Sequence, residues 1–298
     1  MIRHYRKDGF TPLVPPACGG GFPPLVPPAC GGRKRGQRVT GQIRLTGLFM
    51  LAGSLLVGLL AFPLFAILWR ATGVDFLAYA TAPSALAALR LSLLTSTLSV
   101  LITILTGTPL AYGLARRPFN GRAWLELLID LPVVLPPSVA GLGLLMAFGR
   151  QGIFGPALTA LGIHLPFTTA AVIIAQIFVS APLYVRAARL GFAAIDPQLE
   201  ESAHVEGATQ GQVLRYVMLP LAGRALLNGA ILSWTRSLGE FGATILFAGN
   251  LEGRTQTMPL AIYLGFERSL GIALVLSAML LLVSIALLAV LRCLENRH

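Results

Sequence analysis

Long stretches without a charged residue constrain this chain more than any other feature. Residues 45–69 contain no Asp, Glu, Lys or Arg, and comparable windows cover 91–115, 131–149, 151–185 and 269–291. About 20 apolar residues in a helix cross the hydrocarbon core of a bilayer, so each window is long enough for one span. An ordinary soluble domain is excluded, because 55% of the residues are hydrophobic and only 12% are charged.

A sixth span is expected over Ala225–Ala248, although two charged residues interrupt it. The window 151–185 begins with a Gly/Pro-rich loop, so its span should start near Thr168. The sequence therefore predicts an all-α membrane protein with six transmembrane helices over 45–292, followed by a short cytoplasmic tail at 293–298.

The lysines and arginines orient these spans. If the N-terminus is cytoplasmic, seventeen of the 23 basic residues lie inside and one lies within the membrane. The remaining five, which lie outside, are Arg70, Arg90, Arg150, Arg254 and Arg268. Cytoplasmic loops carry an excess of Lys and Arg, so both termini are predicted to be cytoplasmic.

Residues 1–44 differ from the rest of the chain. The segment GFTPLVPPACGG at 9–20 recurs as GFPPLVPPACGG at 21–32, and a basic cluster follows. So much Pro and Gly cannot form regular helix, and two copies are too few to stack into a repeat domain, so a disordered tail is predicted. Cys18 and Cys30 have no further ligand at metal-binding spacing, which argues against a metal site.

The longest polar run between apolar windows reads DPQLEESAHVEGATQGQVLRYVMLP. Asp196 can cap a first helix through its carboxylate, and Gly207 can end that helix in the left-handed conformation. Thr209 and Gln212 form a potential capping box for a second helix, which Pro220 is expected to end.

Two helices joined by a glycine turn also describe a DNA-binding module. Between residues 186 and 224, however, four arginines are balanced by four acidic residues. Affinity for DNA depends largely on neutralising phosphates, so no nucleic-acid partner is expected. A membrane-anchored regulator with a helix-turn-helix module is kept as the alternative from a different class.

The order Glu201, Ser202, Ala203, three residues, Gly207, nine residues, Val-Met-Leu-Pro resembles the EAA loop of ABC importer permeases, with Ser202 where alanine is usual. In that family the loop is the cytoplasmic segment that docks onto the ATPase subunit. The resemblance implies a coupling loop over 190–222. Its candidate contact residues are Glu200, Glu201, Ser202, Ala203, Gly207, Leu219 and Pro220.

Prolines interrupt the third window, which begins near LPVVLPPSVAGLGLL. Pro136 and Pro137 deny backbone donors to the helix, and broken helices are tolerated at membrane depth where protein or a water-filled path satisfies the freed carbonyls. Ser138 is then the first polar candidate for a translocation path. An ordinary proline kink without substrate contact is the alternative.

Arg236 and Glu240 are the charges inside Ala225–Ala248, which is the fifth window in chain order, and their spacing of four allows them to meet on one helix face. A charge at the centre of a bilayer costs about 3 kcal/mol or more, so both should face a partner or a cavity. The pair suits a gate, or a purely structural contact between spans. Thr244 offers a further hydrogen-bond donor along the same path.

The segment FAGNLEGRTQTMPLAIY at 247–263, with GEFGAT and LPPSVAGLGLL, resembles molybdate and tungstate permeases, and sulfate permeases second. The resemblance covers about residues 45–292 and implies a type I ABC importer permease in the inner membrane of a prokaryote. It also implies alternating access by a permease homodimer, two ATPase subunits and an extracytoplasmic oxyanion-binding protein. The external residues expected to face that protein are Asn250, Arg254, Thr255 and Gln256.

Nothing in the sequence predicts catalysis by this chain. Its only lysines are Lys7 and Lys34, so the GxxxxGK[ST] phosphate loop is absent, and ATP and Mg are assigned to the partner ATPase. Four scattered histidines make no metal-binding motif, and neither a metal nor a cofactor is expected in this subunit. A doubly charged oxyanion needs donors and positive potential, which Ser138, Arg236 and Thr244 can supply. The sequence does not distinguish molybdate, tungstate and sulfate as the substrate.

Overall fold

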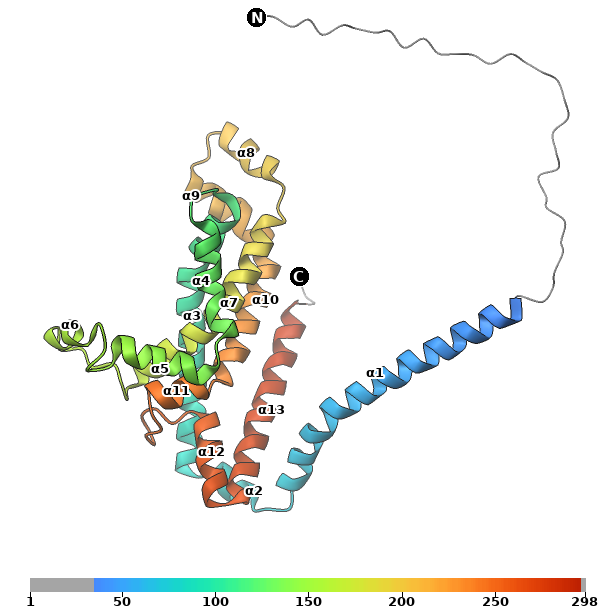
Figure 1. The fold of residues 1–298 in the computed structure, drawn as a ribbon, viewed down its shortest axis with the longest axis vertical. Coiled ribbons are helices and arrows are strands. Elements are labelled where there is room, and N and C mark those ends of the chain that lie inside the picture. The colour runs from blue at the N-terminus through green and yellow to red at the C-terminus, as the bar shows by residue number, and fades with distance from the viewer. Residues whose placement is uncertain (1–34, 296–298) are drawn as a thin grey trace, which may run out of the picture. The chain divides into compact units, whose positions relative to one another are not determined.

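The computed structural model describes residues 35–295, which form helices and connecting segments without a strand (Figure 1). The elements are α1 (Arg35–Ala71), α2 (Phe76–Ala80), α3 (Pro83–Arg116), α4 (Arg122–Val134), α5 (Pro137–Phe148), α6 (Gly155–Ala160), α7 (Thr169–Ala193), α8 (Pro197–Val205), α9 (Gln210–Val213), the π-helical η1 (Leu214–Met218), α10 (Leu219–Leu238), α11 (Gly242–Phe247), α12 (Met258–Arg268) and α13 (Leu270–Glu295). The chain divides within α1 into residues 1–59 and 60–298, and the packing below concerns the second unit.

The two predicted tails fall largely outside the described residues. The duplicated segment 9–32 lies there entirely, as do residues 296–298. Where the description begins, the chain is already helical: α1 starts at Arg35 rather than after residue 44, and α13 continues to Glu295.

The predicted membrane class is confirmed by the lengths of the apolar helices. Within the described residues, five segments are long and apolar enough to cross a membrane: Phe49–Ala71, Pro83–Arg116, Thr169–Ala193, Gln210–Leu238 and Leu270–Ala289. The bent pair α4 and α5 makes a sixth if it counts as one span. Charge-free windows located four of these helices but misplaced their ends. For example, α7 continues to Ala193 instead of ending at Val185, because Arg186 and Arg189 find acidic partners on α4. The other helix, Gln210–Leu238, contains three arginines and was expected over Ala225–Ala248.

The third window is broken rather than kinked. Helix α4 ends at Val134, α5 begins at Pro137, and the two axes differ in direction by 117°. Leu135 and Pro136 have extended backbone with ψ of 137° and 136°, as expected for residues that precede proline. Pro132, by contrast, lies inside α4 and does not end it.

The fifth window, expected as one helix over Ala225–Ala248, is also two helices. Helix α10 ends at Leu238, and α11 starts at Gly242. The start of α11 packs closely on α5: a Cβ at Gly242 would lie 2.7 Å from Cβ of Pro137. Only glycine permits this approach, so the two interrupted windows meet at their breaks.

Pro220 does not end the second helix of the polar run, as the sequence predicted. It lies at the start of α10, and α9, η1 and α10 follow one another without interruption over Gln210–Leu238. A proline inside an α-helix lacks its own N–H and clashes with the carbonyl four residues earlier. The wider π-helical turn over Leu214–Met218 relieves that conflict directly before Pro220.

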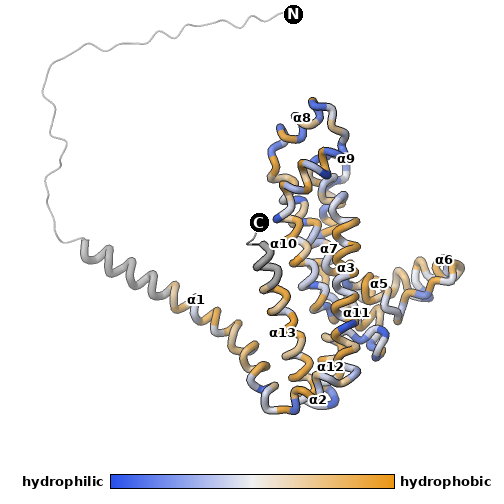
Figure 2. The backbone as a smooth tube through the Cα atoms, turned by 180° about the vertical axis from the view of Figure 1, so that it is seen from behind, coloured by the Kyte–Doolittle hydropathy of each residue, from blue (hydrophilic) through white to orange (hydrophobic). Residues whose placement is uncertain are grey.

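Helices α3, α7 and α10 pack together as the centre of the bundle, with α8 and α9 at one end and α2 and α12 at the other (Figure 1). Beneath α8 and α9, the apolar core includes Tyr184, Phe192 and Met218. Phe247 of α11 belongs to a second core, which α11 shares with α5 and α7. Hydrophilic residues gather at the α8–α9 end, whereas α13 is hydrophobic over most of its described length (Figure 2).

Candidate functional site

The polar run folds as the short helix α8 and the beginning of the long helix Gln210–Leu238, with the predicted caps. The Asp196 carboxylate accepts a hydrogen bond of 3.0 Å from the backbone N–H of Gln198. Gly207 follows the end of α8 with φ of +89°, a conformation that costs glycine little and other residues more. At the start of α9, the N–H of Thr209 donates to Oε1 of Gln212 over 2.8 Å. These sequence predictions are confirmed.

The coupling-loop residues divide between two faces of this segment. Glu201, Ser202 and Gly207 are exposed, and so is Pro220. Another set faces the bundle: Glu200 is only partly exposed, while Ala203 and Leu219 pack against the apolar core beneath. A partner that docks on this end therefore meets the first set and not the second.

Glu240 connects the two helices at the break in the fifth window. One carboxylate oxygen accepts from Nη1 of Arg236 over 2.5 Å, and the other accepts from the N–H of Ala243 over 2.8 Å. Glu240 is 1% exposed, whereas the Arg236 side chain is 34% exposed. The predicted pair is confirmed, but its setting differs: Arg236 lies in the last turn of α10 and Glu240 lies beyond that helix. The Arg236 charge thus suits the C-terminal end of the α10 dipole, and the Glu240 carboxylate suits the N-terminal end of α11.

The other predicted path residues lie at different depths. Pro136 and Pro137 shape the start of α5, and Ser138 follows them with an exposed side chain. Thr244 is fully buried, and its hydroxyl oxygen has no hydrogen-bond partner among the described residues. The structure therefore brings the start of α5 to the α10–α11 break, but it does not place Ser138 and Thr244 on one surface.

A cluster of buried hydroxyls near this break was not found in the sequence. The hydroxyl oxygen of Ser99 in α3 lies 3.2 Å from that of Ser237 in α10. The Ser237 hydroxyl in turn donates to the hydroxyl oxygen of Ser180 in α7 over 2.9 Å. Ser233 donates to the same Ser180 oxygen over 3.2 Å. We call these four residues the serine seam. A signal for it exists in α3, where Ser92, Thr95, Ser96, Ser99 and Thr103 recur at helical spacing and are all buried.

The loop between α11 and α12 is held by its own polar side chains. The Thr255 hydroxyl accepts from the N–H of Leu251 over 2.9 Å, and Asn250 donates to the carbonyl of Leu260 over 3.4 Å. Thr255 and Gln256 are buried, whereas Arg254 is exposed. Of the four predicted external residues, Arg254 is therefore the one that offers its whole side chain to a partner.

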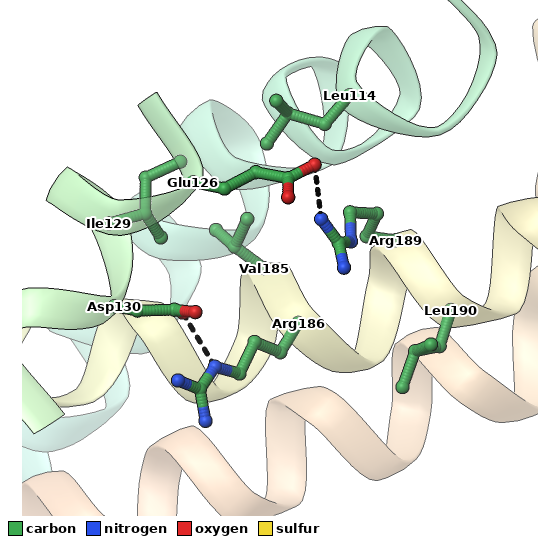
Figure 3. Close-up of a pocket in the computed structure, with 8 residues that line it drawn as sticks. All are labelled: Leu114, Glu126, Ile129, Asp130, Val185, Arg186, Arg189 and Leu190. Atoms are coloured by element: carbon green, nitrogen blue, oxygen red, sulfur yellow. Dashed lines mark hydrogen bonds and ion pairs between the residues drawn. The ribbon is translucent and has the colours of Figure 1, made fainter. Parts of the chain in front are cut away.

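Ion pairs join α4 to α7 (Figure 3). Asp130 accepts from Nε of Arg186 over 2.5 Å, and Glu126 pairs with Arg189. We call these four residues the ion-pair ladder. They line a pocket of about 130 Å³ together with apolar side chains of α3, α4 and α7. No residue of α4 is buried, although Leu125 and Ile129 pack against the apolar core, and the ladder adds a polar attachment of this helix to the bundle.

Within residues 35–295, no group of three or more His, Cys, Asp or Glu side chains is placed to hold a metal ion. The polar chemistry of this part of the chain consists of ion pairs, hydroxyls and amides. Such groups can bind or guide an anion and can link helices.

Two related transport proteins align with most of the chain. It is 44% identical over 231 residues to the molybdenum transport system permease protein ModB of Mycobacterium bovis, covering 78% of this chain and 87% of that one. It is 34% identical over 243 residues to the sulfate transport system permease protein CysT of Salmonella typhimurium, covering 80% and 88%.

A solved bacterial ABC transporter that imports the acidic polysaccharide alginate has the same fold. Its TM-score is 0.70 at 18% identity, with 87% of this chain and 99% of that chain covered, so the predicted permease architecture is confirmed. A family model described as "Binding-protein-dependent transport system inner membrane component" matches residues 104–297. With both the polar run at 196–220 and the broken spans inside the matched region, the chain belongs to this family of inner membrane transport components.

Proposed function

We propose that this chain is the permease subunit of an ATP-driven importer for molybdate or tungstate. The observation that carries the proposal is the 44% identity to a molybdenum permease across 78% of the chain, against 34% to a sulfate permease. Sulfate or thiosulfate transport is the second candidate, because the sulfate permease aligns over a similar share of the chain, 80%.

The proposed assembly contains two copies of this chain, two ATPase subunits and an extracytoplasmic oxyanion-binding protein. The exposed face of α8, with Glu201 and Ser202, supports ATPase docking because it offers polar groups that the bundle leaves free. Arg254, near the opposite end of the bundle, offers a positive charge to the binding protein. This arrangement requires both termini in the cytoplasm of a prokaryotic cell, as the distribution of basic residues indicates.

We assign the translocation path to the meeting point of the two broken spans. Pro136, Pro137 and Ser138 approach it from α5, and Arg236, Glu240 and Thr244 approach it from α10 and α11. The partly exposed Arg236 supplies positive potential, while its bond to Glu240 keeps the pair neutral in the absence of substrate. ATP and Mg act in the partner ATPase, and this subunit contributes the conduit.

Uptake by the reconstituted complex tests this function. Vesicles that contain the chain and its ATPase, supplied with the binding protein, should accumulate radiolabelled molybdate only when ATP is present. Tungstate should compete at similar concentration, and sulfate only at about hundredfold higher concentration. Vesicles without the ATPase are the control.

Two outcomes would overturn the assignment. Uptake of sulfate in preference to molybdate would make sulfate the substrate, and preference for a sugar or an organic cation would remove the oxyanion class altogether. The membrane-anchored regulator of the sequence analysis predicts no ATP-dependent uptake of any solute.

A further inference from the structure

The C-terminal end of α3 contacts the start of α8 and the residue before Asp196 through side chains of this chain alone. The Tyr112 hydroxyl donates to Oε1 of Glu200 over 2.5 Å. Arg116 donates through Nη2 to the carbonyl of Ile195 over 2.7 Å, and its Nε lies 3.4 Å from Oε2 of Glu200. That Nε has no aligned hydrogen bond, so its contact with Glu200 is an ion pair only. We call Tyr112, Arg116 and Glu200 the α3 clasp.

Burial makes the clasp a stronger link than a surface ion pair. Tyr112 is 6% exposed, and the side chains of Arg116 and Glu200 are 12% and 16% exposed. Water competes little for these groups, and removing one partner leaves another charged or polar group buried without its partner. A second contact, from Arg117 to Gln210 over 2.6 Å, lies on the exposed surface and should contribute less.

Two adjacent acidic residues of α8 therefore have different surroundings. Glu200 points to α3 and is occupied by the clasp, whereas Glu201 is exposed and belongs to the face proposed for docking. Glu200 and Glu201 can therefore be compared directly: the first holds α8 to α3, and the second is available to a partner.

From the clasp, α3 leads directly to the break between α10 and α11. About 20 Å of helix separates Tyr112 from Ser99. Ser99 contacts Ser237, the residue whose carbonyl also accepts the backbone N–H of Glu240 over 3.2 Å. A displacement of α8 that carries Glu200 with it must therefore move α3, and α3 reaches the proposed gate through the serine seam.

We propose that Glu200 transmits motion rather than binds the ATPase. It fixes α8 to α3, so that movement of α8 is passed through α3 to the α10–α11 break. This inference rests on the proposed docking of an ATPase on α8. Glu200 is a positioning residue here, since the group that acts on the transported ion lies elsewhere.

Separate measurements of association and coupling test this role. Tyr112→Phe removes one hydroxyl, Glu200→Ala removes the carboxylate, and Glu201→Ala is the matched control. For each variant, the amount of ATPase that co-purifies with the full chain and the number of anions taken up per ATP hydrolysed would be measured. Both clasp variants should retain wild-type ATPase association within about twofold, while uptake per ATP falls by about tenfold, as expected when a hydrogen bond to a charged group is lost.

The control should show the reverse pattern, with less ATPase bound but normal uptake per ATP in the complexes that form. If Glu200→Ala weakens association as Glu201→Ala does, or if uptake per ATP is unchanged in both clasp variants, the proposal is wrong. Loss of the Tyr112→Phe protein from the membrane would also contradict it, because that result assigns the clasp to folding.

These outcomes are separable from failure of the proposed function. Absence of ATPase from the wild-type preparation would refute docking, and uptake of sulfate would refute the substrate. The clasp proposal predicts a different result: the wild-type complex takes up anions at a normal ratio to ATP hydrolysed, and only the clasp variants have a lower ratio.

Discussion

Glu240 shows how a single buried carboxylate can link two helices in a membrane protein. Its oxygens are shared between a guanidinium on one helix and a backbone N–H at the start of the next. The desolvation that burial imposes is offset by two charge-assisted hydrogen bonds, so the pair fixes the geometry of the break more than it adds stability.

Substitutions at this pair should be strongly non-additive. Arg236→Gln leaves Glu240 buried with one partner, and Glu240→Gln leaves the guanidinium without its counter-charge. Each single change should reduce uptake more than the double change does. In a double-mutant cycle on thermal stability, the coupling energy between the two side chains should be about 1–3 kcal/mol. Additive losses would show that the two side chains act independently.

At Gly207, strain rather than crowding should decide which residues are accepted. Its φ is +89°, and no atom lies within 4 Å of an added Cβ. Gly207→Val should therefore re-aim α8 against α9 at a cost of about 1–2 kcal/mol, while Gly207→Asn, which tolerates positive φ, should be milder.

Co-purification of ATPase, normalised to membrane abundance, measures this difference. The valine variant should remain inserted but bind less ATPase, and the asparagine variant should resemble wild type. Equal loss with both residues would point to crowding at a docked partner instead of backbone strain.

At the scale of helices, the sequence predicts which segments exist better than where they end. Charge-free windows located the spans because hydropathy alone determines that a segment can enter lipid. They misplaced the end of α7 because Arg186 and Arg189 are matched by acidic residues that are more than 50 positions away in the chain. The caps at Asp196 and Gly207 were predictable, since their chemistry is local.

The failures at Pro220 and at the fifth window have a related cause. A proline is expected to end a helix, yet a π-helical turn before Pro220 accommodates it. Gly239 is a local signal that a helix can end at Leu238, but the direction of the chain beyond it depends on close packing of Gly242 against Pro137, which belongs to another span. The orientation of Glu200 relative to Glu201 also depends on a distant partner, Tyr112.

The ion-pair ladder should be needed to hold α4 in place. Asp130→Arg puts two like charges opposite each other and should lower uptake severalfold, and adding Arg186→Asp should restore most of it. Arg122→Gln is the matched control, because Arg122 pairs with Glu126 inside α4 and joins no second helix. A double variant no better than the single one would exclude a direct pairing role.

At the scale of the whole molecule, the cysteines offer a test of orientation. All three, Cys18, Cys30 and Cys293, lie in segments predicted to be cytoplasmic, so a membrane-impermeant maleimide should not label the wild-type chain in intact cells. Arg254→Cys, on the exposed loop of the opposite end, should be labelled there at once. Labelling of the wild-type chain in intact cells would reverse the predicted topology.

The serine seam has a consequence for how the protein is made. Ser99 and Ser237 are 138 positions apart, so α3 enters the membrane long before Ser237 has been synthesised. Until then the Ser99 hydroxyl can donate only to a carbonyl of its own helix, as it does to the carbonyl of Ser96. Each cross-helix hydroxyl bond contributes about 0.6 kcal/mol, and the set closes only when α10 arrives. Translation that stops before Ser233 therefore leaves Ser99 and Ser180 without their hydroxyl partners on α10.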